Sequence, residues 1–327
     1  MNPITLTDSP LILKEFLGYM QTIKGKSPKT IQEYYFDLRT FFRFLKISRQ
    51  MTPDNVEFES IPIDDVDIKL LETVTLTDVF EFMNFVLSER DNHAAARARK
   101  TSSLRTFFQY LTSKTGQLKV NPVLELETPR QKKSLPKYLT LEQSIELLNS
   151  VDEGPNKERD YCILTLFLNC GMRLSELVSL NLTDVHFQDR TLKLTGKGNK
   201  ERIVYLNDAC IEALERYLEV RRKERSSSKE DEKSLFLSHL HRRMGRQAVQ
   251  LMVQKYLSKI GLQGQGYSVH KLRHTAATLM YQHGNVDIRV LKDILGHENL
   301  GTTEIYTHLS SEQMATAAES NPLANVK

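Results

Sequence analysis

The chain contains 327 residues, 40% of them hydrophobic and 26% charged, and its formal net charge is +4. This length permits two domains with cores of their own, and the composition is that of an ordinary folded protein. The sequence has no run of about 18 apolar residues and no basic N-terminal segment followed by an apolar one, so we predict no membrane span, no secretory signal and a cytoplasmic location.

The N-terminal part of the chain is predicted to be all helical. A Ser27-Pro28 pair begins a stretch whose apolar residues recur at helical spacing as far as Leu45. The same spacing recurs over residues 75–87 and 94–111, and no convincing strand alternation occurs before these helices end.

Charge is distributed unevenly over this part. Residues 54–91 contain eleven Asp or Glu, whereas residues 97–137 contain ten Lys or Arg and only two Glu. The segment 49–71 is acidic and has no clear period, so we expect a loop or a partly ordered excursion. One face could therefore attract phosphates while another repels them, although two ordinary solvated faces are an equal alternative. The candidate DNA-binding residues are Arg97, Arg99, Lys100, Arg105, Arg130, Lys132 and Lys133.

A basic segment bracketed by Pro129 and Pro136 has almost no apolar residue to bury and is predicted to be a linker. It divides the chain into an N-terminal domain, residues 1–134, and a C-terminal domain, residues 135–327.

The second domain is predicted to be mostly helical with one hairpin, so the predicted fold class is mainly α with a small β-sheet. Its cysteines, Cys162, Cys170 and Cys210, lack metal-ligand spacing and are expected to be reduced structural residues. The expected elements are helices over 140–148 and 160–170, strands over 191–195 and 201–206, and helices over 211–220, over 249–257 and after Ser268.

Arg173 follows Gly171, which ends the second of these helices, so its guanidinium is expected to emerge from a rigid position. A planar guanidinium can bind two phosphate oxygens, and Glu176 on the next turn could hold it. Taken alone, a surface ion pair between Arg173 and Glu176 would be the simpler interpretation.

His270, Arg273 and His274 share one face of the helix that follows Ser268. Two histidines four residues apart can bind zinc, but a lysine and an arginine lie between them and no glutamate does, so we expect no metal. For His274 alone, packing or a structural hydrogen bond is the better hypothesis.

Lys197 lies in the turn Gly196-Lys197-Gly198-Asn199-Lys200, where a flexible ammonium can enter a minor groove or donate a proton to a departing oxygen. Considered alone, this is an ordinary polar turn, and the complete nucleotide-binding loop pattern is absent.

Together these residues suit phosphoryl transfer onto a tyrosine. A pentavalent phosphate gains negative charge, and Arg173, Arg273, His270 and His297 can offset it without a metal or another cofactor. Tyr306 follows all of them in the chain, and nearby cations would favour its phenolate form.

The order of these residues resembles that of the tyrosine recombinases, the phage integrase family. The sequence around each of them is most similar to the Xer site-specific recombinases of bacteria. The similarity extends over most of the chain, and the N-terminal helices resemble the family's core-binding domain. The matched positions are Arg173 in GMRLSEL, Lys197 in GKGNKER, His270 and Arg273 in HKLRHT, His297 in LGH and Tyr306 in IYTH.

The resemblance implies a two-domain clamp around duplex DNA, with a helical core-binding domain and a catalytic domain. It implies that Tyr306 forms a 3′-phosphotyrosine and frees a 5′-hydroxyl, which attacks in a partner strand. The other implied roles are protonation of the leaving 5′ oxygen by Lys197, assistance to proton transfer at the tyrosine by His270, and stabilisation of the phosphorane by Arg173, Arg273 and His297.

The implied partners are a double-stranded DNA recombination site, further protomers in a homotetramer or a heterotetramer with a related recombinase, and a regulatory protein. The implied processes are DNA recombination and integration, and resolution of chromosome dimers during chromosome partition and cell division. An integrase or transposase of a mobile element, a type IB topoisomerase and a catalytically silent DNA-binding protein are the alternatives.

Overall fold

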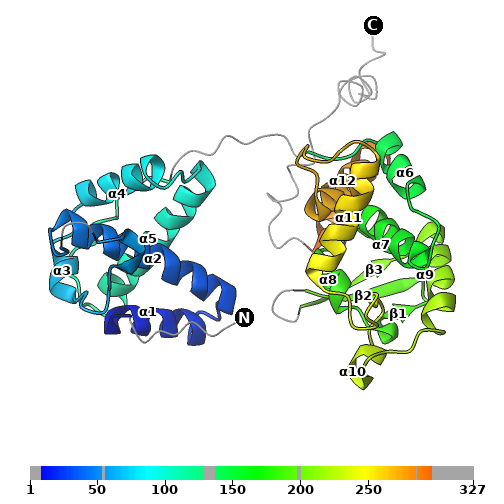
Figure 1. Cartoon of the computed structure of the whole chain (residues 1–327), viewed down its shortest axis with the longest axis horizontal. Coiled ribbons are helices and arrows are strands. Elements are labelled where there is room, and N and C mark those ends of the chain that lie inside the picture. The colour runs from blue at the N-terminus through cyan, green and yellow to red at the C-terminus, as the bar shows by residue number, and fades with distance from the viewer. Residues whose placement is uncertain (1–8, 54–55, 129–136, 197–199, 285, 297–327) are drawn as a thin grey trace, which may run out of the picture. The chain divides into compact units, whose positions relative to one another are not determined.

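The computed structural model describes residues 9–53, 56–128, 137–196, 200–284 and 286–296. The chain divides into two compact units, Met1–Lys133 and Ser134–Lys327 (Figure 1). Helices dominate the described part of both units. The strands β1, β2 and β3 of the described residues form one small sheet in the second unit. The predicted fold class, mainly α with a small β-sheet, is confirmed. Within the described ranges, no helix is long and apolar enough to cross a membrane.

Unit 1 is built around α2, which packs against α1, α4 and α5. As the sequence predicts, the Ser27 side chain caps α2 by accepting a hydrogen bond from the Thr30 amide, and Pro28 occupies the first turn. Phenylalanine rings from several helices fill the core. The elements are α1 (Leu11–Thr22), α2 (Pro28–Ser48), the 3-10 helix η2 (Phe58–Ser60), α3 (Ile68–Glu72), α4 (Leu76–Ser88) and α5 (Ala94–Ser113).

The acidic segment 49–71 is a loop over much of its described length, which is one of the two expectations from the sequence, and it also contains η2 and the first part of α3. Ile63, Val66 and Leu71 of this segment join the hydrophobic core of unit 1. Glu59 pairs with Arg43, and Asp65 lies 2.7 Å from the ammonium of Lys46. Both basic residues belong to α2, so this part of the acidic cluster neutralises charge inside the unit instead of forming a separate repelling face.

Unit 2 contains helices around a three-stranded antiparallel sheet of order β1-β2-β3. The predicted hairpin is present, with Leu192 opposite Val204. The central helix α7 packs against α6, α9 and α12. The elements are α6 (Leu141–Asn149), α7 (Lys157–Cys170), α8 (Leu174–Ser179), η3 (Leu182–Asp184), β1 (Val185–His186), β2 (Thr191–Thr195), β3 (Glu201–Tyr205), α9 (Asp208–Arg221), α10 (Lys229–Glu232), α11 (Arg246–Lys259), α12 (Val269–His283) and α13 (Ile288–Leu295).

Asp78 stabilises the start of α4 and carries a perturbed carboxyl group. Its carboxylate accepts hydrogen bonds from the Thr75 amide at 2.8 Å and from both terminal nitrogens of Arg49 at 2.7 and 2.9 Å. The hydrogen bonds from Arg49 are the main cause that lowers the pKa of Asp78 to about 2 from its ordinary 3.8. The side chains of Asp78 and Arg49 are 9% and 30% exposed, so solvent screens the pair only in part.

We expect this carboxyl to make unit 1 sensitive to acid. Because the folded-state pKa lies below the unfolded one, ionised Asp78 stabilises the fold above about pH 4, and the contribution of about 2 kcal/mol is lost as the pH falls towards about 2. Asp78→Asn should therefore lower the free energy of unfolding near neutral pH by about this amount and flatten its acid dependence, measured by urea unfolding. Asp64→Asn, at an exposed position, is the control and should retain the wild-type pH profile. An unchanged acid dependence in Asp78→Asn would contradict the assignment.

Candidate active site

Arg173 is positioned by the end of one helix and the start of the next. α7 ends at Gly171, which has a left-handed φ of 56°, and Arg173 is the N-cap residue of α8. Its Nη1 donates to Oε1 of Glu176 at 2.9 Å, and its backbone amide donates to Oε2 at 2.7 Å. The predicted pairing is confirmed. The Glu176 side chain is 0% exposed and that of Arg173 is 39% exposed, so the ion pair that the sequence left as the simpler interpretation is present, with its carboxylate buried and its guanidinium partly at the surface.

Arg202, on β3, is a second cation at the same carboxylate. Its Nη1 donates to Oε1 of Glu176, and its Nε donates to the Ile294 carbonyl at 3.1 Å. Burial alone would raise the pKa of Glu176, but hydrogen bonds and charges from Arg202 and Arg173 outweigh it and hold the pKa below its ordinary value. One ionised carboxylate therefore holds two guanidinium groups at neutral pH. The sequence analysis missed Arg202, for which strand alternation offered only a weak indication.

Arg273 comes from α12 and is 3% exposed. Its Nη1 donates to the Gly171 carbonyl at 2.7 Å, and its Nη2 donates to the Leu295 carbonyl at 2.6 Å. Arg173 reaches the next carbonyl along the chain, that of Gly296, at 3.0 Å. The structure thus brings two of the predicted site residues to adjacent carbonyls at the end of α13, although they are far apart in the sequence.

His270 lies one turn before Arg273 on α12 and is an exposed residue, although its ring packs against that of His274. Partial burial of the imidazole lowers its pKa below the ordinary value, and the charges of Arg273, Lys271 and Arg173 lower it further. The imidazole is therefore neutral near pH 7 and can accept a proton. His274 is 8% exposed and its ring lies 4.5 Å from that of His270 in an edge-to-face arrangement, which agrees with the packing role predicted for it.

Lys197, His297 and Tyr306 lie outside the described residues, but the residue before each of the first two is described. The amide of Gly196 donates to the Lys200 carbonyl at 2.7 Å, and a Cβ at Gly196 would lie 3.5 Å from Oε1 of Glu176. Gly296 accepts from Arg173, as described above. The chain therefore reaches the Arg173–Glu176–Arg202 network immediately before both of these candidates.

The described part of the chain holds no cluster of three or more His, Cys, Asp or Glu side chains arranged to bind a metal ion. The cysteines Cys162, Cys170 and Cys210 are all buried and form no disulfide, as predicted for structural thiols. The sulfur atoms of Cys170 and Cys210 lie 3.9 Å apart beneath the end of α7.

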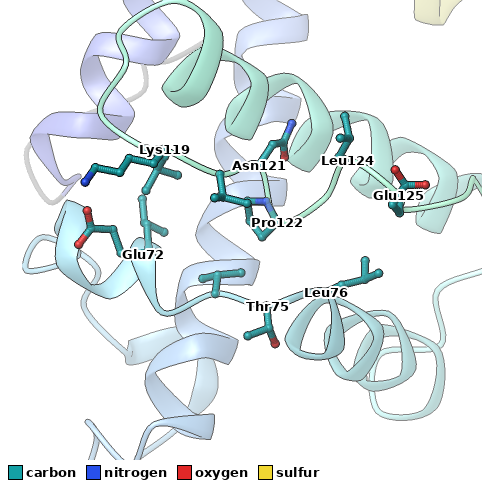
Figure 2. A pocket seen from close by; sticks show the side chains of 12 residues that line it. Glu72, Thr75, Leu76, Lys119, Asn121, Pro122, Leu124 and Glu125 are labelled. Carbon is teal, nitrogen blue, oxygen red and sulfur yellow. The ribbon is translucent and has the colours of Figure 1, made fainter.

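A hollow of about 620 Å³ in unit 1 lacks the chemistry of the arginine cluster. Figure 2 shows its lining, which comes from the junction of α3 and α4 and from the segment after α5, and includes the apolar Leu76, Pro122 and Leu124. Glu72 and Lys119 are the charged residues at one side of the hollow, with Glu125 on the other (Figure 2). No arginine or histidine lines it. The cationic groups of unit 2 are the better candidate for phosphate chemistry.

Comparison with known proteins identifies the family. A family model described as the phage integrase family matches residues 137–313, which is more than half of the chain.

The chain belongs to the phage integrase family.

A tyrosine recombinase XerC of Caldanaerobacter subterraneus subsp. tengcongensis is 52% identical over 315 residues, covering 96% of this chain and 88% of that protein. A tyrosine recombinase XerD of Listeria monocytogenes is 32% identical over 300 residues, covering 91% of this chain and 94% of that protein. The chain is accordingly a site-specific tyrosine recombinase of the Xer type, as the resemblance predicted.

A solved structure shares the fold of this recombinase. It is a XerH site-specific recombinase bound to a palindromic difH substrate, in a post-cleavage complex. The TM-score is 0.72 at 22% identity, and the match covers 94% of this chain and 84% of that one.

The DNA-binding residues predicted for unit 1 of the recombinase need one correction. Lys100 is 7% exposed, and its ammonium lies 3.0 Å from Asp37, which is itself buried. The lysine therefore neutralises an interior carboxylate, and we leave it out of the proposed contacts. Arg130, Lys132 and Lys133 lie outside the described residues.

The other predicted arginines of unit 1 differ in their exposure. Arg105 donates to the Leu126 carbonyl and to the Thr128 hydroxyl at 2.9 Å, so it holds the segment that follows α5. Arg97 is half-buried. Arg99 has a side chain that is 41% exposed, and its Nη1 lies 2.7 Å from carboxylate oxygens of both Glu33 and Asp37, so only its other nitrogens can reach a phosphate. A hollow of about 320 Å³ beside it is lined by Ser27, Lys29, Thr30, Glu33, Tyr34, Arg99, Ser102 and Ser103.

Substitution of Gly171 can show how closely the backbone beside the arginine cluster of the recombinase is packed. A Cβ there would lie 2.9 Å from Cδ2 of Leu295. Gly171→Ala should lower the free energy of unfolding by about 2–3 kcal/mol, from left-handed strain of about 1–2 kcal/mol plus displacement of the α13 end. The control is Gly261→Ala, which has a φ of 72° and nothing within 4 Å of the added carbon, so it meets the backbone strain alone. Equal losses for the two variants in urea unfolding would show that the close approach is unimportant.

Proposed function

We propose that this recombinase cuts and rejoins duplex DNA at a specific site through a covalent 3′-phosphotyrosine on Tyr306. One observation carries the proposal. Arg173 and Arg273 bind the last carbonyls before His297, nine residues ahead of Tyr306 in the chain, while the Lys197 turn begins beside Glu176. The proposed cationic groups therefore lie beside the place where the segment that leads to Tyr306 begins.

In the proposed reaction the arginines offset the charge that develops on the phosphorane. Tyr306 Oη forms a bond to phosphorus and the bond to the 5′ oxygen breaks. Each guanidinium has five N–H donors, so Arg173 can hold both Glu176 and a phosphate oxygen. Arg273 is almost fully buried, and a fixed cation in a site with little water stabilises negative charge more strongly than an exposed one. His297 would add a further donor.

Two proton transfers accompany this step. His270, whose pKa is lowered by partial burial and by the neighbouring cations, is neutral and accepts the tyrosine proton. Lys197 donates a proton to the leaving 5′ oxygen, which becomes a free hydroxyl. The phosphotyrosine conserves the energy of the broken bond, so the reverse attack by a 5′-hydroxyl rejoins a strand without ATP. Attack by the hydroxyl of a partner strand exchanges the strands.

Unit 1 serves as the helical core-binding domain and unit 2 as the catalytic domain, and each of them contacts the DNA. Phosphate contacts from Arg97, Arg99 and Arg105 of α5 supply affinity that falls with salt concentration. The active assembly is a tetramer on two DNA sites, made of this chain alone or with a related recombinase, and a regulatory protein sets its activity. No cofactor takes part.

The biological duty that we propose is resolution of chromosome dimers in the cytoplasm, which couples recombination to chromosome partition and cell division. The extent of the similarity to proteins named XerC and XerD supports this duty over that of a mobile-element integrase. Sequencing of the DNA trapped on the protein in its host tests it. A single chromosomal site near the replication terminus is expected, and many element ends would contradict it.

Tyr306→Phe tests the reaction directly. The substitution removes one oxygen and little packing, so DNA affinity should stay unchanged while the covalent adduct disappears. The measurement is an SDS-resistant complex on a nicked recombination site, run with excess EDTA because the proposed cations are all side chains. Tyr281→Phe, a half-buried tyrosine on α12, is the matched control and should form the adduct. Adduct formation by Tyr306→Phe would disprove the proposal.

Arg99→Met tests the proposed DNA-binding face of unit 1. Removing one phosphate contact should weaken binding by about tenfold and reduce the slope of log affinity against log salt by about 1, for specific and unrelated DNA alike. Lys114→Met removes the same charge from the exposed end of α5 and should leave the slope unchanged. Filter or fluorescence binding over a salt series gives both slopes. Indistinguishable slopes for the two variants would place the contact face elsewhere.

A further inference from the structure

Arg202 makes contacts that the proposed reaction does not use. It lies on β3, where Ile203 and Tyr205 point to the opposite face and are 63% and 80% exposed. The Arg202 side chain is only 14% exposed. It joins two elements far apart in the sequence, because it donates to Glu176 on α8 and to the Ile294 carbonyl on α13.

The end of α13 is shaped to the Arg202 side chain. Gly296 has a left-handed φ of 63°, and a Cβ there would lie 2.9 Å from Cδ of Arg202. The backbone at Gly296 therefore passes directly against the aliphatic part of this arginine. The C-terminal end of a helix carries partial negative charge on its last carbonyls, which a cation at this position stabilises.

Arg202 also determines how Glu176 meets Arg173. The Glu176 carboxylate has no exposure, and its Oε1 accepts from both arginines while its Oε2 accepts from the Arg173 amide. Loss of the Arg202 fork would leave Oε1 free to rotate towards Arg173 alone and would release the Ile294 carbonyl. Both changes alter the direction in which the Arg173 guanidinium points.

The contacts of Arg202 fit positioning better than stabilisation. Among the described residues its Nη2 is buried without a hydrogen-bond partner. A buried guanidinium with an unsatisfied N–H is an expensive way to stabilise a fold, since apolar side chains of similar volume often serve as well. The Arg202 guanidinium carries a positive charge for the Glu176 carboxylate and has a second donor that reaches the Ile294 carbonyl at the end of α13.

We propose that Arg202 is a positioning residue for strand cleavage, which orients Arg173 through Glu176 and fixes the start of the segment that leads to His297 and Tyr306. The inference rests on the proposed function, since it requires Tyr306 to be the nucleophile. Arg202 itself need not touch the DNA or the reacting phosphate.

Arg202→Lys is the test, because lysine keeps the charge and loses the planar fork. The rate of covalent adduct formation is measured in single turnover on a nicked site at saturating protein, and DNA affinity is measured separately. We expect the rate to fall by about 10- to 100-fold while the affinity changes by less than about twofold, since misplacement of catalytic groups acts on the chemical step.

Arg221→Lys is the matched control for stability. Arg221 is 5% exposed and donates to the carbonyls of Ser234, Asp231 and Glu232, so it is another buried arginine of unit 2 that holds backbone oxygens. Both variants are compared by thermal unfolding. A cleavage rate near that of the wild type in Arg221→Lys, at a similar loss of melting temperature, supports positioning by Arg202. Equal loss of rate in the two variants would reduce Arg202 to a stabilising residue and overturn the inference.

A double-mutant cycle with Glu176→Gln tests the route of the effect. If Arg202 orients Arg173 through Glu176, Arg202→Lys should cause a smaller fold loss in the Glu176→Gln background than in the wild type, and the loss that remains comes from the contact with Ile294. Losses that multiply would overturn this route. A wild-type protein without any adduct would overturn the proposed function together with the inference, whereas a wild-type rate in Arg202→Lys would overturn the inference alone.

Discussion

The end of α13 is held by three arginines that come from three separate elements. Arg202, Arg273 and Arg173 donate in turn to the carbonyls of residues 294–296. A helix end has carbonyls without partners inside the helix, and guanidinium groups can satisfy them while they keep further donors for another ligand. The proposed phosphate site and the start of the proposed nucleophile segment therefore share the same side chains.

Glu176 makes this arrangement electrostatically possible. Bringing several guanidinium groups together costs energy unless a carboxylate lies between them, and burial strengthens the attraction as well as the penalty for an unpaired charge. The carboxylate is fully buried, binds two of the arginines and keeps its pKa below the ordinary value. Two glycines complete the packing, because Gly171 and Gly296 approach Leu295 and Arg202 more closely than any larger residue could.

In unit 1, a cluster of like charges in the sequence does not form an equally charged surface in the structure. The stretch of α5 that is rich in Lys and Arg sends Lys100 into the interior, where Asp37 binds it, whereas Arg99 binds Asp37 and Glu33 from the surface and stays 41% exposed. The acidic segment before it likewise pairs with basic residues of α2. Successive residues of a helix point in different directions, so neighbours in a charge cluster can have opposite duties.

The sequence by itself determined the element types, the family and most of the proposed site, because these depend on local periodicity, caps and motifs. It overlooked α1 and α13, although Ile12, Leu13, Phe16, Leu17 and Met20 of α1 and Leu291 and Leu295 of α13 are buried and recur at helical spacing. It also overlooked α8, which is too short to show a strong period.

Only the tertiary structure decided that Lys100 is internal, that Glu176 is buried and that Arg202 joins it to α13. The reason is physical. Whether a cation binds a phosphate, a carboxylate or a carbonyl depends on which groups the packing of distant helices places within about 3 Å of it, and no local pattern specifies those distances.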